Sequence, residues 1–377
     1  MPRLLVVSYH FPPTPGVAPA RVGKLVKYLR RLGWEPSVVS GDAGGSEDPD
    51  LLADVAGVPV AQVRALRGVP SLQRLDWAVA ALAPSVRLAR RADVVLISGG
   101  PFAPFLLGPA LRRPYVLDLR DPWSWEPRFG RLRGGWRRRS GLVLERRLES
   151  VVLRRAAAVV TVAPELAAAY ERQHPSLAGR VHVVRHGFDP EDFSGPEAGA
   201  PATPTLVHVG TMQRPDRTPE LLLAAAALVR ARGRDLGVRL VGPSDAGLAA
   251  EIREDWVDVV GRVPRRRATA EMRRASILWL EPGQLDFLIT GKVYEYLAAG
   301  RPIVAVAPAS GSVARLLEGT GGAVLVQPRA EECAAAIERA LAGDVPARDE
   351  AAIARLAQPG PARDLAAVLD AARERTG

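Results

Sequence analysis

Short apolar runs alternate with helix-forming stretches along almost the whole of this 377-residue chain. Runs this apolar are typical of strands buried on both faces, which occur in parallel sheets covered by helices. The alternation therefore predicts an α/β protein built from doubly wound parallel sheets. The expected strands are residues 4–8, 36–40, 94–98, 116–118, 158–162 and 181–184 in the first half, and 205–209, 238–241, 257–260, 277–280, 302–306 and 323–326 in the second.

A stretch rich in small residues, Pro and Gly separates the two sets of strands. This composition is typical of a linker, and the chain is long enough for two hydrophobic cores. We expect two Rossmann-like domains, 1–195 and 205–345, joined by a linker at 196–204 and facing each other across a cleft. Residues 346–377 are expected to form helices that pack across the domain junction. The other expected helices are 21–32, 142–156, 219–232, 269–275 and 292–299.

The composition excludes several kinds of protein. No apolar run is long enough to span a bilayer, and a strand-like segment follows Met1 too closely for a signal peptide. The single Cys333 excludes an internal disulfide framework, and the five histidines show no spacing typical of metal ligands. We therefore expect a cytoplasmic protein that uses no metal and no cofactor.

Lysine is rare in this chain, since only three of its 51 basic residues are Lys. Lys292 stands at the start of an expected helix, three residues before Glu295. A helix N-terminus presents free N–H groups and the positive end of the helix dipole, which suit an anion. We favour the interpretation that Lys292 binds phosphate and that Glu295 binds ribose hydroxyls. An ordinary solvated ion pair is the alternative.

Polar residues also follow the ends of strands in the first half, where ligands collect in open α/β sheets. The loop around Gly16 could bring backbone amides to an anion or could simply be a stiff connector. After the strand at 116–118, the carboxylates of Asp118 and Asp121 flank Arg120. This group could orient a hydroxyl or accept a proton, and a buried ion pair that holds the loop is the alternative.

The second half has a similar arrangement at the end of its first strand. Gly210 and Thr211 follow the strand at 205–209 directly. Arg217, at the start of the next expected helix, could reach a phosphate or remain a solvated residue at a helix end.

Most of the net charge of +10 comes from one segment, because 128–155 contains ten Arg and only two Glu. Trp123, Trp125 and Trp136 lie in or beside it. Arginine and aromatic side chains together suit the surface of an anionic membrane, which we expect residues 123–155 to contact. A solvated charged face with buried Trp is the alternative. RNA binding is disfavoured because no known module is recognisable and the charge is confined to one patch.

Apolar residues recur at helical spacing in the same segment. They are Leu144, Leu148, Val151 and Val152, and we expect them to face the protein core.

Several short segments follow one another between residue 4 and about residue 330. They are His10-Phe-Pro-Pro with Gly16 and Arg21, Asp118-Leu-Arg-Asp-Pro-Trp123, Val184-Arg-His-Gly-Phe-Asp189, Val209-Gly-Thr211 and Gly291-Lys-Val-Tyr-Glu295-Tyr-Leu-Ala-Ala-Gly-Arg-Pro302. In this order they resemble the GT-B glycosyltransferases of family 4, the group 1 retaining transferases. The resemblance is closest to bacterial members that build cell-surface polysaccharides.

The resemblance implies a retaining, metal-independent hexosyltransferase. Its first domain would bind a saccharide or lipid-linked acceptor and its second a nucleotide-diphosphate sugar. By analogy the diphosphate would be approached by Gly16, Gly210, Thr211, Arg217 and Lys292, the ribose by Glu295, and the base by the region of Val263.

One position departs from the family pattern. The family often carries two Glu separated by seven residues, and the first of them would fall at Phe287 in this chain. The carboxylate that would contact the donor sugar is therefore not identified. A nucleotide-sugar epimerase or hydrolase on the same fold, and a non-catalytic nucleotide- or glycan-binding protein, remain alternatives.

Overall fold

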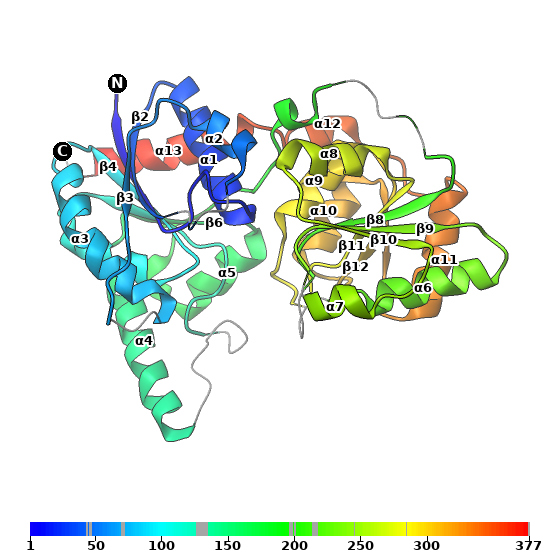
Figure 1. Cartoon of the computed structure of the whole chain (residues 1–377). Helices are drawn as coiled ribbons and strands as arrows, with labels where there is room; N and C mark the ends of the chain where they lie inside the picture. The colour runs from blue at the N-terminus through cyan, green and yellow to red at the C-terminus, as the bar shows by residue number, and fades with distance from the viewer. Residues whose placement is uncertain are drawn as a thin grey trace. The chain divides into compact units, whose positions relative to one another are not determined.

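The computed structural model describes residues 1–375 except 43, 45–46, 69–71, 126–134, 196–198, 200, 213–217, 245 and 284, and it does not describe the side chains of 72, 135–142, 246 and 248. The chain divides into two compact units (Figure 1). Unit 1 consists of Met1–Arg185 and Pro359–Gly377, and unit 2 of His186–Gln358. The division falls before the predicted linker at 196–204, and the predicted C-terminal helical region, 346–377, is shared between the units.

Unit 1 is a parallel sheet covered by helices on both faces. Within the described residues its strands lie in the order β3-β2-β1-β4-β5-β6-β7, and all neighbours are parallel. The elements are β1 (Arg3–Ser8), α1 (Val17–Arg31), β2 (Glu35–Gly41), α2 (Pro49–Asp54), β3 (Val60–Val63), η1 (Leu72–Arg74), α3 (Leu75–Ala89), β4 (Val94–Ser98), η2 (Ala103–Ala110), β5 (Tyr115–Asp118), α4 (Gly135–Arg155), β6 (Ala158–Thr161), α5 (Pro164–Gln173), η3 (Pro175–Leu177), β7 (Val181–Val183) and α13 (Gly360–Glu374).

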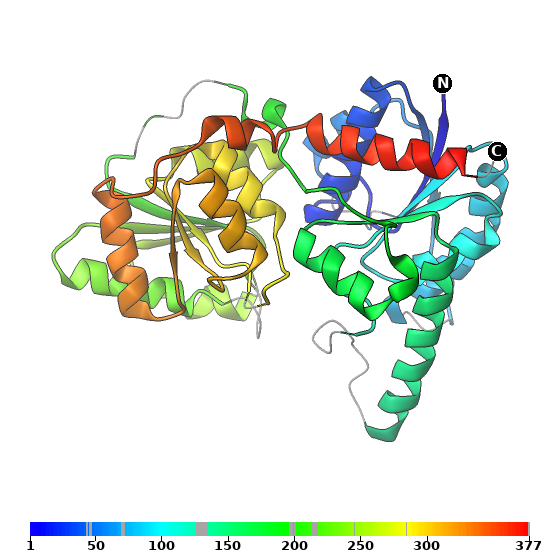
Figure 2. The same ribbon diagram turned by 180° about the vertical axis from the view of Figure 1, so that it is seen from behind.

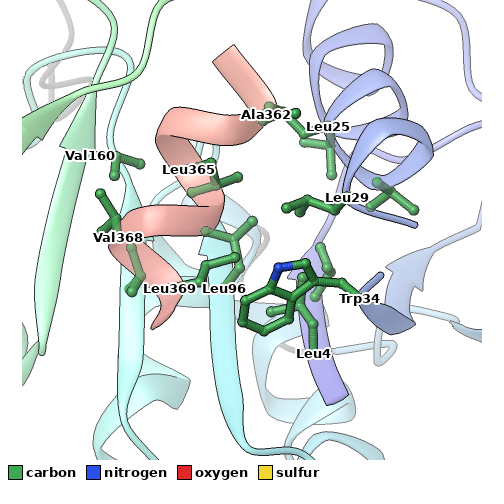
Figure 3. Packing of buried hydrophobic residues seen from close by; sticks show 14 of the residues in the cluster. Leu4, Leu25, Leu29, Trp34, Leu96, Val160, Ala362, Leu365, Val368 and Leu369 are labelled. Carbon is green, nitrogen blue, oxygen red and sulfur yellow. The ribbon is translucent and has the colours of Figure 1, made fainter. Parts of the chain in front are cut away.

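The last helix of the chain completes the core of unit 1. Figure 3 shows Leu365 and Leu369 of α13 against the sheet, with Leu25 and Leu29 of α1 beside them. All four side chains are almost completely buried. Burial of a leucine side chain contributes about 1.5–3 kcal/mol, so α13 is an integral part of this unit.

Unit 2 has the same layered architecture. Its strands, among the described residues, lie in the order β10-β9-β8-β11-β12-β13, again all parallel. Helices α6 and α11 cover one face, and α8, α9, α10 and α12 cover the other. The elements are η4 (Pro190–Phe193), β8 (Thr205–Val209), α6 (Glu220–Ala231), β9 (Gly237–Val241), α7 (Ala246–Glu251), β10 (Val257–Gly261), α8 (Arg265–Arg274), β11 (Ile277–Leu280), α9 (Gly291–Ala299), β12 (Ile303–Val306), α10 (Ser312–Thr320), β13 (Ala323–Val326), α11 (Ala330–Leu341) and α12 (Glu350–Ala354).

The expected fold class is confirmed, and every expected strand is present. Strand β3 was not expected, because it lies at the sheet edge and its four residues are only partly buried or exposed. Strand β3 is only four residues long and contains Gln62, so it lacks the unbroken apolar run of central strands such as β1 and β4.

The expectation for α4 was wrong at three of its four apolar positions. Val152 is buried, whereas Leu144, Leu148 and Val151 are 59%, 39% and 37% exposed. Figures 1 and 2 show the reason, because α4 projects beyond the body of unit 1 with its N-terminal end. Glu149 and Val152, which are buried, mark the side of α4 that packs on unit 1, whereas Leu144, Leu148 and Val151 lie on its exposed side. No described helix combines the length and apolar character needed to cross a membrane.

Candidate functional site

Helix α9 lies at the point where the strand order of unit 2 reverses. The chain runs outward from β8 to β10 and then returns with β11 beside β8. The loop after β11 leads into α9, and the Tyr296 hydroxyl accepts a hydrogen bond from the Val209 N–H at the end of β8 (2.8 Å). Ligands of open α/β sheets bind beyond the carboxyl ends of strands at such a reversal. The start of α9 is therefore the candidate site of unit 2.

The local sequence explains where α9 begins and ends. The Thr290 side chain caps the N-terminus by accepting a hydrogen bond from the Lys292 N–H (3.3 Å). Gly300 ends the helix with a φ of 73°, a left-handed conformation that glycine adopts without strain. Lys292 thus lies in the first turn, beside N–H groups that have no partner within the helix.

Four charged side chains of unit 2 alternate in sign beside this helix start. Lys292 Nζ lies 2.5 Å from Glu295 Oε2, and Arg265 Nη2 lies 3.0 Å from Glu295 Oε1. Arg265 Nε also donates to Asp192 Oδ2 at 2.6 Å. We call these four residues the charge ladder. Each carboxylate oxygen of Glu295 therefore has a cation beside it.

The ladder keeps Glu295 ionised although the residue is only 8% exposed. Burial alone would raise the pKa of the carboxyl group, but the charges and hydrogen bonds of Lys292 and Arg265 lower the pKa to about 2. Glu295 is thus a buried anion whose charge depends on two neighbouring cations.

Glycines bring backbone close together at the end of β8. A Cβ atom on Gly242 would lie 2.0 Å from the Gly210 carbonyl oxygen, and the φ of Gly242 is 141°. Only glycine fits this position, which brings the end of β9 against Gly210 and Thr211. Val263 is half-buried between β10 and α8. Arg217 lies outside the described residues.

The candidate residues of unit 1 form a buried ion-pair cluster at the end of β5. Asp118 is 1% exposed. Its two oxygens accept hydrogen bonds from Arg21 (3.0 and 3.3 Å), and one of them also accepts from Ser98 Oγ (2.8 Å). Burial raises the pKa of Asp118, but Arg21 and Arg120 lower it to about 2. These contacts favour the second interpretation of this segment, in which Asp118 anchors the loop.

Arg120 is placed differently from Arg21. One of its Nη atoms donates a hydrogen bond to the Gly99 carbonyl. Its Nε lies 3.8 Å from an oxygen of Asp118 and has no hydrogen-bond partner among the described residues. Burial and the charges of Arg120 and Arg74 lower the pKa of His10. A buried guanidinium N–H with no acceptor can bind a substrate oxygen.

For Asp121, the backbone carbonyl accepts a hydrogen bond from the Tyr170 hydroxyl (2.9 Å).

Gly16 and the tryptophans also lie in unit 1. Gly16 is the N-terminal cap of α1, at the end of the loop that follows β1. Trp123 is only 3% exposed and stacks on Phe102 with ring centroids 5.7 Å apart, so its predicted contact with a membrane was wrong. The reason is that its ring packs against Phe102 and Phe105 inside unit 1. Trp125 packs edge-on against Tyr170, and the side chain of Trp136 is not described.

Sequence reasoning missed Arg265, Asp192 and the pairing of Arg21 with Asp118. Asp192 is 73 residues from Arg265 in the charge ladder. In unit 1, Arg21 is 97 residues from Asp118. Contacts this distant in the chain leave no spacing pattern. One signal was present, because residues 265–267 are three consecutive Arg in the first turn of α8, where the helix dipole disfavours cations.

Two family models match the chain. The glycosyl transferase 4-like domain matches residues 16–187, and the glycosyl transferases group 1 domain matches residues 203–343. No curated protein sequence matched the chain.

Solved structures share the fold over nearly the whole chain. Sucrose-phosphate synthase from Thermosynechococcus elongatus is 19% identical with a TM-score of 0.68, and the match covers 100% of this chain and 98% of that one. A putative UDP-N-acetylglucosamine 2-epimerase from Listeria monocytogenes is 12% identical (TM-score 0.64; 100% and 98% covered). The lipopolysaccharide outer core galactosyltransferase WaaB is 11% identical (TM-score 0.61; 98% and 99% covered). Identities this low show a common fold and nothing about the substrate. With its two matched domains and two parallel sheets, the chain belongs to the group 1 (family 4) glycosyltransferases and has the GT-B fold.

Proposed function

We propose that this protein is a retaining, metal-independent hexosyltransferase that moves a sugar from a nucleotide-diphosphate donor to a saccharide or lipid-linked acceptor during cell-surface glycan synthesis. The observation that carries the proposal is the position of Lys292, in the first turn of α9 at the strand-order reversal of unit 2. A departing diphosphate needs charge neutralisation there, and N–H groups with an adjacent ammonium supply it.

The donor would lie along the carboxyl ends of the strands of unit 2. Gly210 and Thr211, directly after β8, would approach the diphosphate with their backbone, and Arg217 and Gly16 remain candidates for the same group. Glu295 would bind ribose hydroxyls, and Val263 would lie near the base. Transfer then depends on stabilising charge on the leaving phosphate, with no covalent intermediate on the enzyme.

The acceptor would be bound by unit 1. Arg120 is the best-supported residue there, since its buried Nε has no acceptor among the residues described. Asp121 would contribute a carboxylate beside it, and Asp118 would hold the loop in place through Arg21. The cytoplasmic location remains a prediction.

A panel of nucleoside diphosphates tests the donor class. We expect one of the uridine, thymidine, guanosine, cytidine and adenosine diphosphates to raise the melting temperature most, because a ligand that binds only the native state stabilises it. The corresponding nucleotide sugar should be consumed only when an acceptor is present. Consumption without an acceptor would indicate an epimerase or hydrolase, and binding without any consumption would indicate a non-catalytic protein.

The exposed face of α4 supports a membrane-borne acceptor. Leu144, Leu148 and Val151 recur along one side of the helix and are exposed. The surrounding segment, 128–155, carries ten Arg and two Glu. An apolar stripe among arginines suits an anionic bilayer surface, where the stripe enters the interface and the cations meet lipid headgroups.

Replacing apolar residues of this stripe should release the protein from membranes. We expect Leu144→Glu/Leu148→Glu to reduce binding to phosphatidylglycerol-containing vesicles by about tenfold or more, since each acidic residue removes buried apolar area and opposes the lipid charge. Vesicle co-sedimentation measures the effect. Leu52→Glu on α2, where the leucine is 47% exposed, is the matched control and should bind as wild type does. Equal binding of the double variant and wild type would contradict this surface.

A further inference from the structure

Arg265 occupies a position that helix electrostatics disfavours. It is the first residue of α8, and the first turn of that helix contains no acidic residue. The N-terminal end of a helix repels cations, so Arg265 requires compensation from elsewhere. Asp192 and Glu295 supply it, at 2.6 and 3.0 Å. Arg265 is therefore held beside Glu295 by tertiary contacts, against the local preference of its own helix.

When Lys292 turns toward an anion, the charge ladder determines how many cations remain beside Glu295. Lys292 is 20% exposed and is the member of the ladder in the first turn of α9, whereas the side chains of Arg265 and Glu295 are 13% and 11% exposed. If Lys292 leaves Glu295 for a phosphate oxygen, Glu295 becomes a buried carboxylate with one cation fewer. A buried charge that loses its only partner is strongly destabilised. Arg265 prevents that, because it contacts the other carboxylate oxygen.

We propose that Arg265 is a positioning residue that holds Glu295 ionised, so that Lys292 is released to the donor diphosphate when the donor binds. The proposal rests on the proposed function, and it adds a residue that the family resemblance does not name. Arg265 acts through Glu295 and Lys292 and is not itself a ligand of the diphosphate.

The charged groups around Glu295 support this role. Helix α9 packs against α8, β11 and η4. Of these, α8 brings Arg265 to Glu295, and η4 brings Asp192 to Arg265. Strand β11 is apolar throughout. His186 also lies beside α9, with its ring 6.2 Å from that of Tyr294. Burial raises the pKa of Glu295 and the two cations oppose that effect, so removing Arg265 should raise the pKa of Glu295 above its wild-type value.

The test compares nucleotide affinity across pH in three variants. The probe is the nucleoside diphosphate that stabilises the wild-type protein most, and its Kd is measured by calorimetry between pH 5.5 and 8. For Arg265→Met at pH 8 we expect the affinity to be about tenfold or more below that of wild type, because Lys292 then remains bound to Glu295. A tenfold change in affinity corresponds to an interaction free energy of one pKa unit. As the pH falls, Glu295 is protonated more readily in Arg265→Met than in wild type, and Lys292 is released. The ratio of the variant Kd to the wild-type Kd should therefore fall toward one.

The controls separate this role from a purely structural one. Arg265→Lys keeps a charge and should follow the wild-type pH profile more closely. Arg267→Met removes an arginine of the same helix turn whose side chain is 60% exposed, and it should match wild type throughout. An Arg265→Met protein with wild-type affinity, or with a weakening that is the same at every pH, would overturn the inference. A wild-type protein that binds no nucleoside diphosphate would instead overturn the proposed function itself.

Discussion

Lys292→Ala is expected to abolish the thermal shift that nucleoside diphosphates produce in the wild-type protein. The lysine lies in the first turn of α9, where its ammonium group adds to the free N–H groups of the helix start. Loss of one group that stabilises the leaving-group charge typically costs about 3–4 kcal/mol of transition-state stabilisation, so the sugar-transfer rate should fall about 10²–10³-fold. Calorimetry and steady-state donor consumption measure the two effects.

The chain offers a matched control for this substitution. Lys27 is paired with Asp54 at 2.8 Å in unit 1. Lys27→Ala should change the stability of the protein without changing the nucleotide-induced shift. Glu295 also keeps Arg265 as a partner in the Lys292→Ala protein, so we expect that protein to fold. A Lys292→Ala protein that responds to nucleotide as wild type does would show that the diphosphate binds elsewhere.

Asp118→Ala is expected to destabilise unit 1 by about 3–5 kcal/mol, because it leaves a buried arginine without its carboxylate. The side chains of Arg21 and Asp118 are 2% and 1% exposed. Arg21 also donates to the carbonyls of Val184 and Arg185, so the pair joins the start of α1 to the chain segment that follows β7. Denaturant unfolding measures the change.

Two further substitutions test whether this effect comes from the ion pair. Arg21→Met/Asp118→Leu removes both charges and should be less destabilised than the sum of the two single variants. Asp93→Ala breaks an exposed pair with Arg3, in which the side chains are 56% and 34% exposed, and should cost about 1 kcal/mol or less. Equal losses from Asp93→Ala and Asp118→Ala would show that the buried pair does not stabilise unit 1.

The pH dependence of stability gives an independent measure of Asp118. Its pKa is lowered to about 2 in the folded protein. A carboxyl group with a lowered folded pKa stabilises the native state above its unfolded pKa of about 4, and that contribution is lost as the pH falls toward 2. Wild type should therefore lose stability between about pH 5 and pH 2. Asp118→Asn should lack that part of the loss.

The sequence by itself determined the architecture of both units. Central strands such as β1 and β11 are buried on both faces, so they appear in the sequence as unbroken apolar runs. The boundaries of α9 were also readable, because Thr290 and Gly300 have local roles as caps that require no distant partner. Strand β3 was not recognised in this way, since it has only four residues, one of them Gln62, and none of them is fully buried.

Only the tertiary structure decided which polar residues work together. Lys292 and Glu295 are neighbours on one helix, so their pairing could be predicted from spacing. Arg265 and Asp192 join them through contacts between separate elements, and the partners of Asp118 come from α1 and β4. Helical spacing likewise did not decide whether Leu144 and Leu148 are buried or exposed. Periodicity identifies an apolar face, and the surrounding fold determines whether anything covers that face. A charge or an apolar stripe acquires its role from the groups brought against it, and folding alone brings together residues distant in the chain.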